Sequence, residues 1–490
     1  MNDQFSSLSE SQITTVTLSD DTMKQREFHQ QLQAVLESSD TLSALEGVVS
    51  SKQFLIPHGV EQIVRAKLGL AAPDEWIKKL SSWGAASVGV LSLKEYVEWM
   101  TSGVHVDAPS AALSQLIPGQ IPEQLEDKSL GFLPGSFAGP YDWHIDERGV
   151  NAVAAWRMFA GQEKFANALP WKDVRIAHID TGYTEHKALG WSGGSSGTVF
   201  PNEGADLLDG LKDTDGPRDP FLPGFPGHGT RISATIAGYD PTAQGGPFYG
   251  VAPGAQIIPF RVTDSVIIDH VKEHVHDAVI LAIEQQCHVV NISLGALFPS
   301  DHLSTALDIA YEKGLIVVCA AGQGWGEVIY PGRLNRCVTL GGVGPRLKPW
   351  RRAAKGPYVD LCGPADGIRH VRAEPWKPGG VTPASMAAES GHGTSHATAC
   401  CSGAAALWLA WHGVDALHDK YAQTGLWQIP KAFKYLAMKS AKPGKWSGEE
   451  KGNYGSGVLD VAALLQMPLP SAGSMRKENP AAAAFDAGGL

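Results

Sequence analysis

The sequence lacks the segments that would direct it out of the cell or into a membrane. It has no run of about 18 apolar residues, the length that a membrane-spanning helix requires. Residues 1–7 contain no basic stretch followed by an apolar one, so the start is not typical of a secretory signal. We therefore expect a cytoplasmic protein with no membrane partner, and leave export by a non-classical route open.

Cysteine is scarce and confined to the later part of the chain. None precedes Cys287, and the six cysteines are spaced neither as a disulfide framework nor as a zinc site. Most stand inside apolar runs, as Cys319 does within residues 316–320. We interpret them as small buried hydrophobic residues, which agrees with a reducing compartment and predicts no metal bound through them.

Basic residues are fewer than acidic residues. The chain has 40 basic and 51 acidic residues, for a formal net charge of −11. A surface that binds nucleic acid or an anionic membrane needs an excess of basic residues, so neither is expected as a partner. The imbalance is greatest in residues 1–140, which hold 17 acidic and 9 basic residues.

The composition changes along the chain and divides it into five segments. Apolar residues from Phe28 to Leu36 at helical spacing, and a capping box that begins at Ser92, indicate helices in the first third. Clusters of proline and glycine then indicate a linker. We predict a disordered N-terminus, a mainly helical region, that linker, a large folded domain and a flexible tail, at residues 1–22, 23–128, 129–142, 143–467 and 468–490.

From about residue 143, short apolar runs alternate with helical stretches. The runs have the β-branched character of buried strands and occupy residues 174–179, 257–262, 289–292, 315–320 and 337–343. This alternation predicts the α/β class, with a parallel sheet that is flanked by helices. Functional groups in such sheets gather at the carboxyl ends of the strands, where Asp180 is expected.

Three residues carry the groups of a nucleophilic mechanism. Asp180, His228 and Ser395 stand in three short glycine-containing segments, at residues 179–182, 227–230 and 391–398. A serine hydroxyl needs a base to remove its proton, and histidine suits that role near neutral pH. A buried carboxylate can then orient the histidine and stabilise its positive charge. We therefore predict a catalytic triad.

The order Asp, His, Ser and the motifs around these residues resemble the subtilisin-like serine proteases, the subtilases. Further similar segments are residues 250–255, 291–295, 320–322 and 454–460. The resemblance covers about residues 143–467 and leaves the first 140 unexplained. It implies a serine endopeptidase that cleaves a protein or peptide substrate through an acyl-enzyme on Ser395.

The resemblance also implies the other site residues. Gln323 stands where the family usually has the asparagine that holds the oxyanion, so we expect its amide to donate there. Ser293, Leu294, Gly295 and Gly322 are expected to line the substrate cleft and to pair with the substrate through their backbones. The nucleophile helix departs from the family at two positions, where histidine and alanine replace the usual methionine and proline.

No cofactor is expected for catalysis. Subtilases often bind structural calcium, but residues 239–249 lack a clear ligand pattern, so we predict no metal at that loop. Residues 1–140 are expected to act as an intramolecular inhibitor or as a partner-docking module. The alternative function is a catalytically impaired, protease-like binding or regulatory protein. The presence of Gln323 in place of the usual asparagine would be a sign of that impairment.

Two other motifs are typical of different protease mechanisms, but each fits less well than the serine mechanism. The Asp-Thr-Gly triplet at Asp180 also occurs in aspartic proteases, but residues 213–216 only resemble the second triplet that they need. Residues 270–274 fit an inverted zinc-protease pattern, and we interpret them as a solvated helix face instead. For His392 and His396, beside the nucleophile, packing roles are favoured over catalysis.

Overall fold

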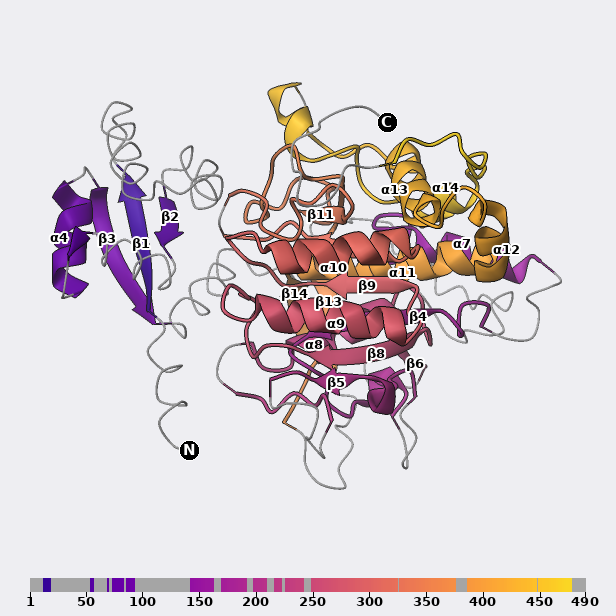
Figure 1. Ribbon diagram of the computed structural model, residues 1–490, viewed down its shortest axis with the longest axis horizontal. Helices are drawn as coiled ribbons and strands as arrows, with labels where there is room; N and C mark the ends of the chain where they lie inside the picture. The colour runs from indigo at the N-terminus through magenta and orange to yellow at the C-terminus, as the bar shows by residue number, and fades with distance from the viewer. Residues whose placement is uncertain are drawn as a thin grey trace, which may run out of the picture. The chain divides into compact units, whose positions relative to one another are not determined.

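The 490-residue chain is described by a computed structural model (Figure 1). It divides into two compact units, the smaller containing the elements before residue 108 and the larger beginning at Pro109. The structure describes residues 12–18, 53–56, 68–69, 73–82, 85–92, 142–162, 169–191, 197–208, 216–222, 225–241, 248–324, 326–375, 386–446 and 448–477.

The smaller unit is a three-stranded antiparallel sheet with a helix packed on it. Its central strand, β1 (Gln12–Leu18), pairs with β2 (Gln53–Ile56) and with β3 (Ala85–Ser92). Helix α4 (Pro73–Ser82) lies against β3. The described residues of this unit are therefore α+β, and the prediction of a mainly helical region is wrong for them.

The strands of the smaller unit bear on two predictions made for single segments. Residues 12–18, predicted to be disordered, form β1, because their threonine, valine and isoleucine are β-branched residues that favour strands. Strand β3 extends to Ser92, the residue where the predicted capping box begins, and the helix predicted after it lies outside the described residues. Residues 28–36, the remaining basis of the helical prediction, lie outside the described residues, as does nearly all of the predicted linker.

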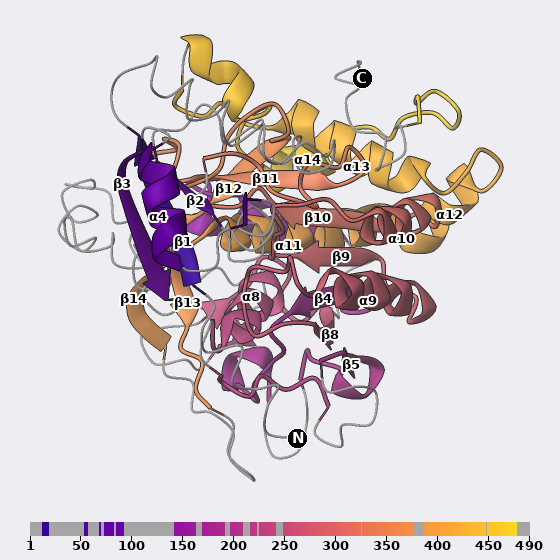
Figure 2. The same ribbon diagram turned by 60° about the vertical axis from the view of Figure 1, so that its left-hand side comes forward.

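The larger unit is built on one parallel sheet of seven strands (Figures 1 and 2). Its spatial order is β12-β11-β10-β9-β4-β8-β5, and every neighbouring pair is parallel. The predicted α/β fold is thus confirmed. The strands are β4 (Arg175–Asp180), β5 (Ala205–Asp206), β8 (Gln256–Arg261), β9 (Val289–Ile292), β10 (Ile316–Ala320), β11 (Val338–Val343) and β12 (Leu361–Pro364).

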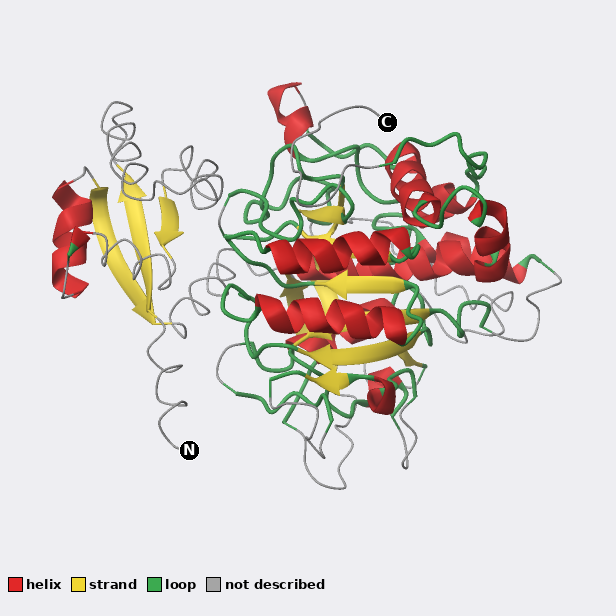
Figure 3. Ribbon diagram, viewed as in Figure 1, coloured by secondary structure: helices red, strands yellow, loops and turns green. Residues whose placement is uncertain are grey.

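Helices cover both faces of this sheet (Figure 3). Alternate residues of β4 show the two layers, since Ala177 and Ile179 join one core cluster and Ile176 joins the other. Helices α9 (Lys272–Glu284) and α10 (Asp301–Glu312) pack on the first face. Helices α8 (His228–Ala237) and α11 (Thr394–His412) pack on the second, together with most of the large buried aromatic residues.

The remaining elements surround this core. The α-helices are α7 (Ala152–Ala160), α12 (Val414–Tyr421), α13 (Gln428–Ser440) and α14 (Val461–Leu465). Two antiparallel pairs are β6 (Tyr239–Asp240) with β7 (Phe248–Tyr249), and β13 (Asp366–Val371) with β14 (Met386–His392). Short 3₁₀ helices are η4 (Asp142–His144), η6 (Lys187–Leu189), η7 (Pro201–Glu203) and η8 (Gly448–Asn453).

The chain after residue 467 packs on the larger unit, so the predicted flexible tail needs correction up to Lys477. The Tyr421 hydroxyl donates to the carbonyl of Pro470, and the Gly473 N–H donates to the Gln428 side chain. Met475 packs on the apolar core. Among the described helices, none combines the length and the apolar character needed to cross a membrane.

Candidate active site

Two of the three predicted triad residues stand at the beginning of helices, and the third ends a strand. Asp180 is the last residue of β4, at the carboxyl end of the sheet, and His228 is the first residue of α8. Ser395 is the second residue of α11. Gly393, just before that helix, has a φ of 142°, which side-chain-bearing residues rarely adopt. The motifs therefore lie at turns that bring strand ends and helix starts together.

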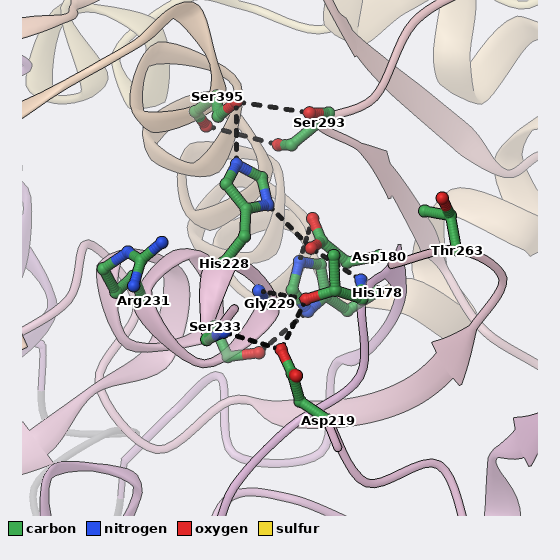
Figure 4. A network of polar contacts seen from close by, with 12 residues as sticks. His178, Asp180, Asp219, His228, Gly229, Arg231, Ser233, Thr263, Ser293 and Ser395 are labelled. Carbon is green, nitrogen blue, oxygen red and sulfur yellow. Dashed lines mark hydrogen bonds and ion pairs between the residues drawn. The ribbon is translucent and has the colours of Figure 1, made fainter. Parts of the chain in front are cut away.

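The three side chains meet in one line of polar contacts (Figure 4). His228 Nδ1 lies 2.7 Å from Asp180 Oδ1, and His228 Nε2 lies 3.2 Å from Ser395 Oγ. Asp180 is fully buried and His228 is 8% exposed, whereas Ser395 is partly exposed. Ser395 thus has more exposed surface than its two partners, which are held in the interior.

The electrostatics of this line favour a charged carboxylate. Burial by itself would raise the pKa of Asp180, but attraction to His228 and donors from His178 and His228 outweigh burial. The pKa of this carboxyl therefore lies well below its usual range. Oδ1 accepts a second hydrogen bond, at 2.8 Å, from the backbone N–H of Thr181. An ionised Asp180 can orient the imidazole and stabilise its positive charge.

Asp219 ties the end of β4 to the start of α8. Its Oδ2 accepts hydrogen bonds from the Thr181 hydroxyl at 2.8 Å and from the Gly227 N–H at 2.7 Å. The Thr181 oxygen in turn accepts the Gly229 N–H at 3.1 Å. A methyl group on Gly229 would lie 1.9 Å from the Gly182 carbonyl, so only glycine allows this approach. Burial raises the pKa of Asp219 above its ordinary value.

Sequence reasoning missed Asp219. It stands in a loop whose residues carry no motif, and its side-chain partner Thr181 lies 38 positions earlier in the chain. No local pattern connects the two positions, because the contact forms only when β4 and α8 are assembled. The nearest available signal was the neighbouring Asp-Thr-Gly turn itself, whose threonine needs an acceptor once it is buried.

The predicted cleft residues follow the ends of two adjacent strands, β9 and β10. Ser395 Oγ lies 3.2 Å from the Ser293 carbonyl oxygen, the same distance as from His228 Nε2, and the Ser293 hydroxyl donates to the Ser395 carbonyl at 3.3 Å. Leu294 is buried in the core that α9 and α10 cover, so its side chain does not line a cleft. Gly322 accepts the Ala354 N–H at its carbonyl.

Gly295 is already paired with another part of the chain. Its N–H donates to the Val266 carbonyl and its carbonyl accepts the Ile268 N–H, each at 2.9 Å. An extended substrate therefore finds no available N–H at Gly295 in this arrangement. The prediction that Gly295 pairs with substrate through its backbone would require residues 266–268 to move away.

Gln323 lies against the start of the nucleophile helix. Its side-chain oxygen accepts the Thr394 N–H at 2.9 Å. This hydrogen bond fixes which end of the amide is the oxygen. The Gln323 Nε2 group is then the end of the amide that can donate. The predicted oxyanion residue and Ser395 are thus brought to the same turn, since Thr394 and Ser395 are adjacent.

The two histidines beside the nucleophile have partners of their own. His392 Nδ1 lies 2.5 Å from Asp366 Oδ1, and its ring stacks on Trp350. His396 Nδ1 lies 3.0 Å from the Thr235 hydroxyl. Burial holds the pKa of His396 well below its usual range. Neither contact involves Ser395 or Asp180, which agrees with the packing roles expected for both residues.

The rival motifs do not form sites within the described part of the chain. Residues 270–274 straddle the start of α9, and no three His, Cys, Asp or Glu side chains among the described residues are grouped to hold a metal ion. Residues 209–215, which contain most of the possible second Asp-Thr-Gly, are outside the description, as are 242–247 of the loop where we predict no calcium. All six cysteines are buried and unpaired.

Comparisons with known proteins point the same way as the geometry. The family model described as "Subtilase family" matches residues 172–457. The chain is 28% identical over 242 residues to the major intracellular serine protease of Bacillus subtilis (strain 168), covering 47% of this chain and 70% of that protein. It is 29% identical over 241 residues to Subtilisin Savinase of Lederbergia lenta, covering 48% and 75%.

The comparison of structures concerns the fold alone. A protease from Pseudoalteromonas arctica superposes with a TM-score of 0.50 at 20% sequence identity. The match covers 66% of this chain and 96% of that one. The parallel sheet and its flanking helices are therefore an arrangement that a solved protease shares.

Proposed function

Because the chain belongs to the subtilase family of serine proteases, whose members act on protein or peptide substrates, we propose that it is an endopeptidase with an Asp180–His228–Ser395 triad. The observation that carries the proposal is the unbroken line of contacts from Asp180 through His228 to the Ser395 hydroxyl. A protease-like binding protein without activity is disfavoured, because it would have no need to keep all three groups aligned.

The geometry supports an acyl-enzyme mechanism. Ser395 Oγ attacks the substrate carbonyl carbon while His228 Nε2 takes the hydroxyl proton, and Asp180 stabilises the imidazolium. His228 then gives that proton to the leaving amine, and water releases the acyl group in the same way. Each proton taken by His228 is returned, so the cycle needs no cofactor.

Substitutions in the triad test this proposal. Ser395→Ala and His228→Ala should each reduce peptidase activity by a factor on the order of 10⁴ or more, because the nucleophile or its base is lost. Wild-type protein should also react with a fluorophosphonate probe, and Ser395→Ala should not. Circular dichroism serves as the control for folding. Wild-type turnover in either variant would refute the assignment.

Gln323 and the N–H of Ser395 are the proposed oxyanion donors. The first N–H groups of a helix have no partner within the helix, so the Ser395 N–H in the first turn of α11 can bind a developing negative charge. Gln323 Nε2 belongs to an amide whose oxygen is anchored by Thr394, which fixes where the donor can reach. An anchored donor costs little reorganisation during the reaction.

Replacing Gln323 should therefore affect the transition state more than substrate binding. Gln323→Ala should lower kcat by about 10²-fold or more with KM nearly unchanged, since the hydrogen bond strengthens as the oxyanion forms. Gln323→Asn keeps the amide and should retain part of the activity or improve it. Steady-state kinetics on a peptide substrate measure both. Wild-type kcat in Gln323→Ala would mean that another group holds the oxyanion.

Ile329 restricts the space beside the nucleophile. A methyl group placed on Gly295 would lie 1.9 Å from Ile329 Cδ1, and one placed on Gly322 would lie 2.7 Å from the same carbon. The Ile329 side chain therefore lies between the two glycines, next to the segments that contact Ser395 and Thr394. We propose that the enzyme prefers a small side chain on the residue before the scissile bond.

Shortening Ile329 should widen that preference. Ile329→Ala should raise kcat/KM for substrates with leucine or phenylalanine before the scissile bond, by about 10- to 100-fold relative to alanine substrates. Val328→Ala is the matched control, because the neighbouring Val328 is buried in a core cluster and is not among the atoms closest to Gly295 and Gly322. A peptide-library cleavage profile gives the ratios. An unchanged profile in Ile329→Ala would refute the role.

The N-terminal residues are proposed to regulate the peptidase domain. The propeptides of subtilases are usually small α+β domains that block the cleft, and the described part of the smaller unit has this mixed composition. Residues 1–140 also carry most of the net negative charge, which sets them apart from the rest of the chain. We favour an intramolecular inhibitor over a partner-docking module.

Removal of residues 1–140 tests this role. A chain that begins near Tyr141 should be more active than the full-length enzyme, and an added 1–140 fragment should suppress it. Mass spectrometry of the purified protein should show a cut within residues 129–142 that Ser395→Ala prevents. If the shortened chain folds without gaining activity and the fragment does not inhibit, partner docking becomes the better hypothesis.

A further inference from the structure

A second histidine faces the carboxylate of Asp180, on the oxygen that His228 does not contact (Figure 4). His178 Nε2 lies 3.4 Å from Asp180 Oδ2, and His178 Nδ1 lies 2.8 Å from the hydroxyl of Ser233. The carboxylate thus has a histidine beside each oxygen, and each histidine contacts a serine hydroxyl. On Oδ1 the histidine is His228 and the serine is Ser395. On Oδ2 they are His178 and Ser233.

The position of His178 is one that an apolar residue would normally occupy. It lies on a central strand that is buried on both faces, and it is only 2% exposed. Such strands are usually made of valine, isoleucine and leucine, as Ile176 on the same face illustrates. Burying an imidazole costs free energy unless both nitrogens have partners. The Ser233 hydroxyl satisfies Nδ1, and the carboxylate of Asp180 is the polar group that faces Nε2 at 3.4 Å.

Those partners determine the tautomer. A carboxylate only accepts hydrogen bonds, so His178 Nε2 carries the proton that faces Asp180. His178 Nδ1 is then the acceptor for the Ser233 hydroxyl. The separation of 3.4 Å is longer than an ordinary hydrogen bond, and neither atom has a hydrogen-bond partner within the described residues, so each is the polar group that the other faces. The two buried groups are consequently matched to each other.

We propose that His178, oriented by Ser233, is a positioning residue that fixes the Asp180 carboxylate and shares its negative charge, and thereby sets the basicity of His228. The inference rests on the proposed function. Oδ1 already accepts from His228 and from the Thr181 N–H. Without His178, the buried Oδ2 would lose the polar group that lies 3.4 Å from it, and the carboxylate would attract the proton on His228 more strongly.

Other titratable groups surround this pair. Arg231 on α8 interacts electrostatically with Asp180 and Asp219, and His396 on α11 interacts with His228. Asp219 approaches from the loop beside β4. Substitution of His178 or Ser233 leaves all of these residues unchanged in the sequence. A change in pH dependence between variants therefore reports the contact of His178 with Asp180.

Amide variants separate the two contacts of His178. The amide nitrogen of His178→Gln can reach the position of Nε2 and keep a donor toward Asp180. The shorter amide of His178→Asn reaches only the position of Nδ1, beside Ser233. His178→Leu removes both contacts at similar volume. The three substitutions thus distinguish loss of the carboxylate contact from a general disturbance of the core.

The experiment is the pH dependence of kcat and kcat/KM on a peptide substrate, from about pH 5 to about pH 9. In His178→Leu and His178→Asn, kcat should fall about tenfold with KM unchanged, as expected for losing one hydrogen bond to a charged group. The acidic limb of the plot of kcat/KM against pH should move to higher pH, because His228 would hold its proton more strongly. His178→Gln should keep the wild-type limb, and Ser233→Ala should shift it in the same direction by less.

Wild-type kcat and acidic limb in His178→Leu, or a His178→Gln variant as impaired as His178→Leu, would overturn the proposal. If His178→Leu does not fold, Ser233→Ala decides, since an unshifted limb there refutes the role. Wild-type and Ser395→Ala proteins are assayed in parallel. A wild-type protein that neither cleaves peptide nor reacts with a fluorophosphonate would instead refute the proposed function.

Discussion

The carboxylate of Asp180 has no exposed surface, and an isolated charge in such a place would cost several kcal/mol. The surrounding structure offsets this cost with polar groups that come from three directions. The strand supplies His178, the turn after it supplies the Thr181 N–H, and α8 supplies His228. The charge can persist only while strand, turn and helix are assembled, so the site and the fold depend on each other.

The sheet order explains why the other groups arrive at the same place. β4 has β9 as its neighbour, and β9 is followed by β10. Because the strands are parallel, the segments that leave their carboxyl ends are adjacent, which places Ser293 and Gln323 near the start of α11. Helix α11 lies across the central strands on the face that α8 also covers, so Ser395 meets His228 there.

The segments at these strand ends also determine the surroundings of Ser395. The segments after β9 and β10 hold Ser395 and Thr394 in position, and Ile329 occupies the space between their glycines. Residues 266–268 form hydrogen bonds with both the N–H and the carbonyl of Gly295. The nucleophile is thus partly exposed, while the space next to it is narrow.

The α/β class, the triad and its neighbours could be predicted from the sequence because each rests on local patterns. Apolar runs that alternate with helices require a covered parallel sheet, and Asp180, His228 and Ser395 stand in short motifs whose glycines permit tight turns. The N-terminal strands were missed because β-branched residues such as those of β1 were outweighed by the polar composition around them.

Only the tertiary structure decided which residues support the triad. Thr181 and Asp219 are 38 positions apart, His178 and Ser233 are 55 apart, and Gln323 and Thr394 are 71 apart. A hydrogen bond between such residues depends on the packing of α8 and α11 on the sheet, and no local pattern encodes that distance. The sequence by itself determined the chemical groups and the turns that carry them, whereas packing determined how the buried charge of Asp180 is shared.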